Sequence, residues 1–119
     1  MLGTFTTGDF PNDVLFDGAN IWVVSFLDGT IAKLRPSDGA LLGKRIVGNS
    51  LHGLAFDGND VWVTSTSDNA VVRLGRGLAL IKKTYTVEDS PFGIIFDGTS
   101  VWVANYNSAT VSKITRTGP

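Results

Sequence analysis

The sequence predicts an all-β fold, a β-propeller to which the chain contributes three four-stranded blades. Two observations support this prediction. A Phe-Asp-Gly motif followed by Trp-Val recurs every 40 residues, and short apolar segments between turn residues fill each repeat. The copies begin at Phe16, Phe56 and Phe96, with their tryptophans at Trp22, Trp62 and Trp102. Residues 1–119 therefore form a single half-propeller domain, made of blade units 10–49, 50–89 and 90–119.

Composition excludes several classes of protein. With 43% hydrophobic residues and 14 glycines, the chain is expected to be folded. A net charge of -1 argues against a nucleic-acid partner. No segment has the roughly 20 consecutive apolar residues of a membrane span, and the first residues do not read as a signal peptide. The absence of cysteine rules out disulfides and thiolate metal sites. We expect a soluble protein without a membrane partner, in an unknown compartment.

Each unit is expected to contain four strands separated by turns. Asp-Gly provides the first hairpin turn, because glycine accepts a positive φ and aspartate caps the turn. This interpretation is preferred to calcium binding, since the alternating oxygen ligands of a calcium loop are missing. The expected strands are 14–16, 54–56 and 94–96 (first), 21–23, 61–63 and 101–103 (second), 30–34, 70–74 and 110–114 (third), and 42–47 and 81–87 (fourth).

The first two strands of each unit are apolar at successive positions, which is typical of a sheet covered on both faces. A propeller blade lies between two neighbours and is such a sheet. The third strand alternates, so Lys33, Arg73 and Lys113 are expected to point outward. A two-sheet sandwich would predict polar alternation in the second strand, which is absent. The pattern therefore favours the propeller.

The third unit lacks a fourth strand, while the N-terminus offers one. Residues 2–9 align with residues 42–49 at an offset of 40. Propellers close with about four to eight blades, so three blades cannot form a ring, whereas two chains supply six. We expect a homodimer with strand exchange, in which residues 2–7 of each chain complete the last blade of the other. The alternative is that the chain is part of a longer propeller of six or seven blades.

The third unit, with Pro91 to Gly98 followed by Val101-Trp102-Val103-Ala104-Asn105, resembles the YVTN-type repeat. It is also similar to blades of the streptogramin (virginiamycin B) lyase family. The resemblance implies a propeller fold. Proteins with such repeats include binding proteins as well as lyases. Leu51-His52-Gly53 looks like the family's histidine loop, with leucine in place of proline. The resemblance then implies His52 and Glu88 as catalytic residues that work with magnesium to open a cyclic depsipeptide.

Ligands of propellers usually bind at the mouth of the central channel. The loops expected there contain six acidic residues and no lysine or arginine, which predicts an acidic ligand site that attracts positively charged groups. The acidic residues are Asp9, Asp13, Asp28, Asp68, Glu88 and Asp89. The alternative interpretation is that aspartate, asparagine and serine simply populate turns.

Three functional hypotheses follow. The first is a binding or interaction module for a small-molecule, peptide or protein ligand, without a cofactor or metal. The second is the magnesium-dependent lyase-like enzyme, in which neutral His52 acts as a base. The third is a structural scaffold without a small-molecule site. The candidate ligand-binding residues are Asn12, Asp13, Phe26, His52, Asp68, Glu88, Phe92 and Tyr106.

Overall fold

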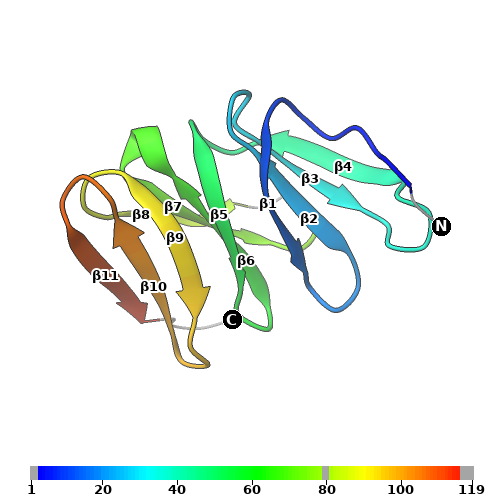
Figure 1. Ribbon diagram of the computed structural model, residues 1–119. Coiled ribbons are helices and arrows are strands. Elements are labelled where there is room, and N and C mark those ends of the chain that lie inside the picture. Colours follow the sequence, from blue (N-terminus) through cyan, green and yellow to red (C-terminus); the bar gives the residue numbers. More distant parts are fainter. Residues whose placement is uncertain (1–2, 79–80, 116–119) are drawn as a thin grey trace.

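The computed structural model describes residues 3–78 and 81–115 (Figure 1). Short antiparallel strands make up this part of the chain, and turns of three to six residues connect them. Its one helical turn is a 3-10 turn, Thr66–Asp68. No helix in these residues is long and apolar enough to cross a membrane. The strands are β1 (Pro11–Phe16), β2 (Ile21–Ser25), β3 (Thr30–Leu34), β4 (Leu41–Ile46), β5 (Leu51–Phe56), β6 (Asp60–Ser65), β7 (Ala70–Gly75), β8 (Ile81–Thr86), β9 (Pro91–Phe96), β10 (Ser100–Asn105) and β11 (Thr110–Thr115).

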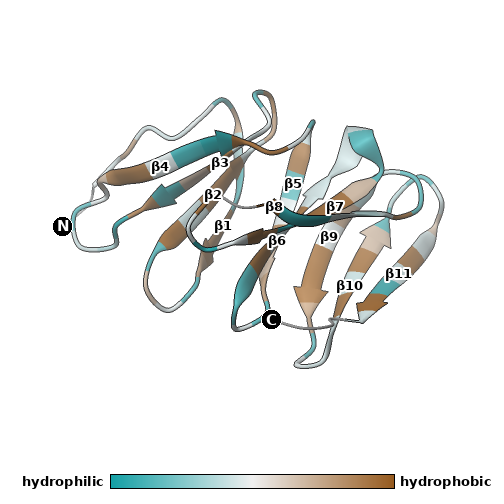
Figure 2. Ribbon diagram, turned by 180° about the vertical axis from the view of Figure 1, so that it is seen from behind, coloured by the Kyte–Doolittle hydropathy of each residue, from teal (hydrophilic) through white to brown (hydrophobic). Residues whose placement is uncertain are grey.

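The strands form three sheets of consecutive antiparallel neighbours, which confirms the propeller blades. The sheet orders are β1-β2-β3-β4, β5-β6-β7-β8 and, in the described residues, a three-stranded β9-β10-β11. The first strands of the sheets, β1, β5 and β9, contact one another in turn, as the innermost strands of a propeller do (Figure 1). Hydrophobic bands run along the strands, and most loops are paler or hydrophilic (Figure 2).

The Asp-Gly turns form as predicted. Asp17 Oδ1 accepts hydrogen bonds from the backbone N–H groups of Ala19 and Asn20, at 2.8 and 2.7 Å. Gly18 has a φ of 93°, which an L side chain rarely adopts. The second carboxylate oxygen of Asp17 accepts a hydrogen bond from Trp22 Nε1 at 2.8 Å. The same bonds recur in the other blades, so each turn also anchors the tryptophan of its blade, which is buried in the first two blades and half-buried in the third.

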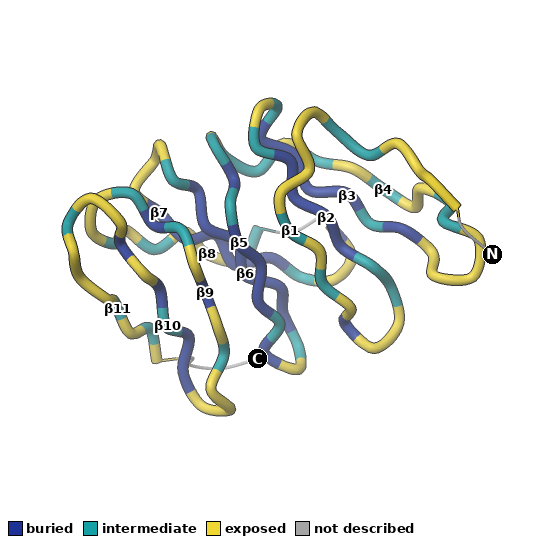
Figure 3. The backbone as a smooth tube through the Cα atoms, viewed as in Figure 1, coloured by how far each residue is buried: buried dark blue, intermediate teal, exposed yellow. Residues whose placement is uncertain are grey.

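The hydrophobic core lies between the blades. One cluster joins the first two blades and includes Trp22 and Val63, and a second joins the second and third blades and includes Trp62 and Val103. The middle sheet is therefore covered on both faces, as the successive apolar positions predicted. Figure 3 shows its strands mostly as buried, and more exposed backbone toward the two ends of the stack.

The expectation that the basic residues of the third strands point outward is wrong for Arg73, which is buried, whereas Lys33 is half-buried and Lys113 is exposed. Lys33, Arg73 and Lys113 each stand opposite a tryptophan in the strand ladder. Their cationic groups lie 5.1–5.5 Å from the tryptophan ring centroids. Arg73 is buried and pairs with buried Asp60 at 2.8 Å. Side chains opposite each other in a ladder share a face, so each cation lies on the same face as its tryptophan, and Arg73 is held in the interior by Trp62 and the Asp60 carboxylate.

The outer face of the third blade has no neighbour within the described chain. Val111 on β11 is 64% exposed, whereas Ile31 and Val71, which occupy the same position in the first two blades, are fully buried. The repeat thus places an apolar residue where a further blade would cover it. Residues 3–7, the described part of the predicted exchanged strand 2–7, form no strand within the single chain.

Candidate functional site at the channel mouth

The mouth is built from the same turn in each blade. Three residues that precede β1, β5 and β9 adopt left-handed backbone, with φ of 57° to 61°. The carbonyl oxygen of each accepts a hydrogen bond from the first residue after the second strand, at 2.8–3.1 Å. The turn therefore fixes two side-chain positions per blade at this edge. The donor and acceptor pairs are Phe26 with Phe10, Thr66 with Ser50, and Tyr106 with Ser90.

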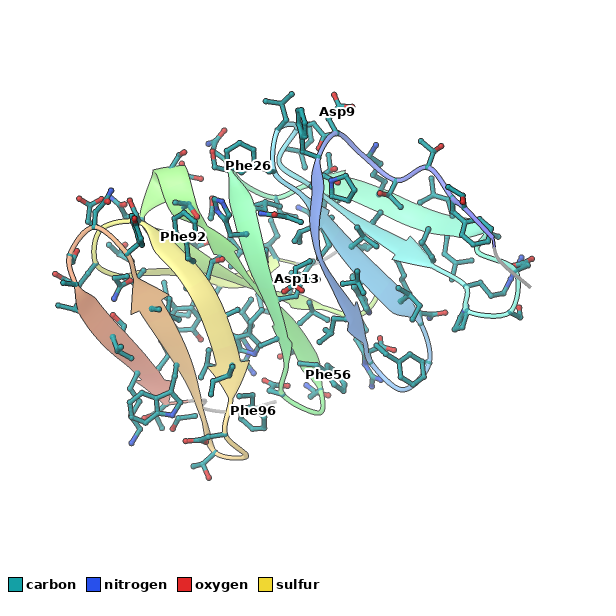
Figure 4. All side chains as sticks on the ribbon, in the orientation of Figure 1. Asp9, Asp13, Phe26, Phe56, Phe92 and Phe96 are labelled. Carbon is teal, nitrogen blue, oxygen red and sulfur yellow. The ribbon has the colours of Figure 1, made fainter. Side chains whose placement is uncertain are left out.

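Four rings lie in sequence across these turns, and we refer to Phe26, His52, Phe92 and Tyr106 as the aromatic row. His52 stacks on Phe92 with a centroid separation of 3.9 Å and an interplanar angle of 24°. Phe26 meets His52 edge-on at 5.0 Å, and Tyr106 lies 5.4 Å from Phe92. Figure 4 shows Phe26 and Phe92 at one edge of the sheets, with Phe56 and Phe96 at the opposite edge. Residues of all three blades thus meet in one aromatic surface.

The hydrogen bonds of His52 determine its tautomer. Thr66 Oγ1 donates to the carbonyl oxygen of Pro91 at 2.6 Å. A hydroxyl has one proton, so in the 2.6 Å contact between His52 Nδ1 and Thr66 Oγ1 the imidazole nitrogen is the donor. Neutral His52 therefore carries its proton on Nδ1 and its lone pair on Nε2. Burial lowers the pKa of His52 below its ordinary 6.5, partly offset by the Ser50 carbonyl. The ring is thus neutral near pH 7 and can accept a hydrogen bond.

Two hollows of about 390 and 380 Å³ meet at Phe26 and His52. Both are lined by aromatic, apolar, hydroxyl and amide side chains, and no charged residue contributes to either lining. The remaining lining residues of the first hollow are Phe10, Asn12 and Leu27, and those of the second are Ser50, Thr66, Ser67, Ser90, Phe92, Tyr106 and Asn107.

The structure separates the predicted site residues into two groups. Asn12 and the four members of the aromatic row line the hollows. Asp13, Asp68 and Glu88 do not. Asp13 lies between the first two blades, where its Oδ2 accepts the backbone N–H of Leu54 at 2.9 Å (Figure 4).

The other two predicted carboxylates, Asp68 and Glu88, also lie outside the linings of the hollows. Asp68 accepts hydrogen bonds from Ser65 Oγ at 2.7 Å and from Asn49 Nδ2 at 3.0 Å, and these bonds lower the pKa of its carboxyl. Glu88 is exposed on the loop before β9. Asp68 thus connects its own turn with the loop that contains Asn49. This agrees with the interpretation of the acidic residues as turn residues.

Sequence reasoning missed seven residues that line the hollows: Phe10, Leu27, Ser50, Thr66, Ser67, Ser90 and Asn107. The period held the information needed to find them. Phe10, Ser50 and Ser90 are one repeated position, two residues before the chosen Asn12, His52 and Phe92. Leu27, Ser67 and Asn107 are another, directly after the position of Phe26, Thr66 and Tyr106. Chemical type alone gave no reason to select a serine or a leucine at these positions.

Magnesium under the lyase hypothesis requires oxygen ligands that converge. Within residues 3–78 and 81–115, no three histidine, aspartate or glutamate side chains gather closely enough to hold a metal ion. Among the described residues, His52 and Glu88 therefore do not form such a site with other side chains.

Solved structures similar to this chain include a β-propeller domain and streptogramin B lyases, whereas no protein-family model and no curated protein matches it. Virginiamycin B lyase from Staphylococcus aureus has 24% identity and a TM-score of 0.69 over 82% of this chain and 34% of its own. Hydrazine synthase of Kuenenia stuttgartiensis has 20% identity and a TM-score of 0.74 over 88% and 32%. The β-propeller domain of Cps50 (Swd1) from Myceliophteria thermophila has 12% identity and a TM-score of 0.77 over 96% and 38%.

The chain spans about a third of the length of each of these structures. At these identities the likeness concerns the fold, because one propeller architecture supports many unrelated functions. Among the neighbours are streptogramin B lyases, in line with the resemblance found in the sequence. The chain has a lyase-like β-propeller fold.

Proposed function

We propose that this protein is a propeller binding module whose ligand lies on the aromatic row, with two copies of the chain closing into a six-bladed ring. The observation that carries the proposal is the stack of His52 on Phe92, continued by Phe26 and Tyr106, beside two hollows. Tyr106 is 74% exposed, so the row offers ring surface to a ligand. Flat aromatic surface with a few polar groups around it is typical of small-molecule sites.

The lining chemistry favours a neutral ligand with one flat or apolar face and several hydroxyl or amide groups. The rings would contact the apolar face, and Nε2 of His52 would accept a hydrogen bond. The side chains of Ser50, Ser90 and Asn107 supply further polar groups around the second hollow. If the acidic residues of the mouth act on ligands instead, the preferred ligand is an aromatic amine, attracted by the negative rim.

Two probes distinguish these ligand types in protein NMR titrations of the intact chain. Cellobiose is neutral and polyhydroxylated, and tryptamine is aromatic and cationic. We expect cellobiose to shift the ring resonances of His52 and Tyr106, and Phe92→Ala to weaken this binding about tenfold, the loss of roughly one stacking contact. Asp68→Asn should leave cellobiose binding unchanged. Stronger binding of tryptamine, reduced by Asp68→Asn, would support the acidic site.

A structural scaffold without a small-molecule site remains the outcome if neither probe shifts these resonances at millimolar concentration. That result would contradict the proposed ligand site while leaving the fold untouched.

The lyase-like alternative draws on the Nδ1–H tautomer of His52, since Nε2 is then the basic nitrogen that a general base needs. The test is turnover of a type B streptogramin with magnesium, comparing the natural chain with His52→Ala. Opening of the cyclic depsipeptide by the natural chain, lost in the variant, would support this alternative. No turnover by the natural chain removes it.

A further inference from the structure

We propose that β11 takes residues 3–7 of a second copy as its fourth strand, in a register that the two complete blades define. The inference rests on the ring closure proposed above and adds the strand, the pairing and the way in which the seam completes the mouth. It concerns the outer faces and the open strand edge of the first and third blades, which lie outside the aromatic row.

The first blade is open on its outer face in the same way as the third. Val14 on β1 is 65% exposed, whereas Leu54 and Ile94, at the same position in the other blades, are 6% and 8% exposed. The first and third blades therefore present two complementary surfaces of one repeat. One presents the face that a preceding blade would cover, and the other presents the face and edge that a following blade would cover. Exposed apolar faces and open strand edges of this kind favour association.

The N-terminal segment already lies where the outer strand of a preceding blade would lie. A Cβ on Gly8 would be 2.5 Å from Ser25 Oγ, and a Cβ on Gly48, at the end of the fourth strand of the first blade, would be 2.3 Å from Ser65 Oγ. Gly8 therefore lies against the first blade as Gly48 lies against the second.

A second pair of contacts supports the same placement. The ring of Phe5 lies against Gly39 in the turn between β3 and β4. In the next blade, Leu78 in the turn between β7 and β8 lies against Gly43 of β4 and accepts a hydrogen bond from Arg45 at its carbonyl oxygen. Phe5 and Arg45 are equivalent positions of the repeat. Residues 3–8 thus lie against the first blade as β4 and the residues after it lie against the second, although the other strands of a preceding blade are absent from the described chain.

The register follows from the two complete blades. β4 on β3 and β8 on β7 pair equivalent residues, from Thr30 with Ile46 and Ala70 with Thr86 onward. Applied to β11, this common register pairs each described residue of the N-terminal segment with one residue of the open edge. The resulting pairs are Thr110 with Thr6, Val111 with Phe5, Ser112 with Thr4, and Lys113 with Gly3.

A hydrogen bond at the mouth end of the ladder is expected to close this pairing. The carbonyl oxygens of Gly29 and Asn69 accept the N–H groups of Val47 and Val87 at 3.0 and 2.9 Å. Ala109, the equivalent residue of the third blade, has the same left-handed backbone, with a φ of 54° against 65° and 52°. Its carbonyl oxygen is thereby oriented for the N–H of Thr7 from a second copy.

The seam would also complete the mouth. Asn12, His52 and Phe92 are equivalent positions, and His52 lies beside Phe26 of the preceding blade. Tyr106 is the equivalent of Phe26 in the third blade. In a closed ring, Asn12 of the second copy would therefore lie beside Tyr106 of the first. Each ring would have two such composite positions in addition to the two aromatic rows.

Cysteine cross-linking tests the register directly, because the chain contains no cysteine. The bond from Val47 to Gly29 makes Thr30–Ile46 a non-hydrogen-bonded pair, and Ala32–Lys44 is the next one. Ser112–Thr4 is equivalent to the latter, with Cα atoms about 4.5 Å apart, within the range of a disulfide.

The full-length Thr4→Cys and Ser112→Cys variants, one of them with a size tag, are mixed and gently oxidised. We expect the mixed disulfide of the two variants to form at least tenfold faster than either homodisulfide. The control replaces Ser112→Cys with Val111→Cys, whose side chain lies on the other face of β11. This mixture should link no faster than the homodisulfides.

The native mass and the cross-linking rates together distinguish a failure of the proposed register from a failure of ring closure. A native mass of two chains together with equal rates for both mixtures would overturn the register but not ring closure. A native mass of one chain and no preferential linkage would overturn both. Probe binding to the aromatic row, measured on the same samples, is independent of either result.

Discussion

At the residue scale, His52 connects the aromatic row to the backbone beneath it. It stacks on Phe92, donates from Nδ1 to Thr66, and through Thr66 is linked to the carbonyl oxygen of Pro91. Burial of the His52 ring disfavours its imidazolium form, and this both lowers the pKa of His52 and keeps the ring that stacks on Phe92 neutral.

This lowered pKa predicts a pH dependence of stability. Between the ordinary value of 6.5 and the lower folded value, the unfolded chain binds more protons than the folded chain, so stability falls as the pH falls through this window. His52 is the only histidine. We expect the melting temperature to drop between pH 7 and pH 5, and the drop to shrink in His52→Asn, which introduces the residue found at position 12. An undiminished drop in the variant would contradict this assignment. Thermal unfolding followed by circular dichroism measures both.

At the scale of the structural element, each blade begins with a hairpin whose turn also holds a tryptophan. Asp57 is buried, and its oxygens accept the N–H groups of Asn59 and Asp60 and the Nε1–H of Trp62, at 2.6–2.9 Å. Arg73 lies over the other side of this ring. One carboxylate thus fixes the turn between β5 and β6 and the orientation of the largest core side chain of the blade.

Asp57→Ala should therefore destabilise the chain by about 2–3 kcal/mol, because it leaves a buried indole N–H and turn N–H groups without their acceptor. Urea unfolding followed by tryptophan fluorescence gives the difference. The control is Asp38→Ala, which removes an exposed ion pair with Arg35 and should change little. Equal losses in the two variants would show that the turn carboxylate has no special role.

At the scale of the whole molecule, the three blades form an arc with two unlike ends. Apolar residues that are buried between blades in the middle are exposed at the ends, as with Val111. A ring has no such ends. Two chains of 12.7 kDa provide six blades, which lies within the range known for propellers.

A charge on the open end should therefore prevent association. We expect the natural chain to have a native mass of about 25 kDa at micromolar concentration, twice its 12.7 kDa, and Val111→Lys to be monomeric. Leu27→Lys is the matched control, because Leu27 is similarly exposed but lies in a mouth loop. Analytical ultracentrifugation measures the masses. A natural chain that stays monomeric, or a Val111→Lys variant that stays dimeric, would contradict closure through this face.

Much of the fold was predictable because its determinants are local and repeated. The Asp-Gly turns and the limits of the third strands agree with the structure to within a residue, whereas the second strands extend two residues further than predicted, to Ser25, Ser65 and Asn105. The first strands begin earlier than predicted because Pro11, Leu51 and Pro91 still pair with the end of the second strand, beyond a shift in register. The inward position of Arg73 was not predictable, since its partners Trp62 and Asp60 lie on another strand.

The candidate site was only partly predictable for a related reason. Aromatic residues in the mouth loops were found from their chemical type, and the structure brings all four into one row. The carboxylates were chosen from their charge, yet Asp13 and Asp68 use their oxygens within and between loops. A charged residue in a sequence does not disclose which N–H groups of other segments its oxygens accept.

The sequence by itself thus determined the number of blades, their turns and the buried tryptophans, because a 40-residue period and adjacent turn residues act over short distances along the chain. Only the tertiary structure decided which side chains form the mouth, because His52 meets Phe26 and Phe92 from different blades. The same holds for the proton on His52 Nδ1, which depends on a carbonyl oxygen 39 residues further along the chain.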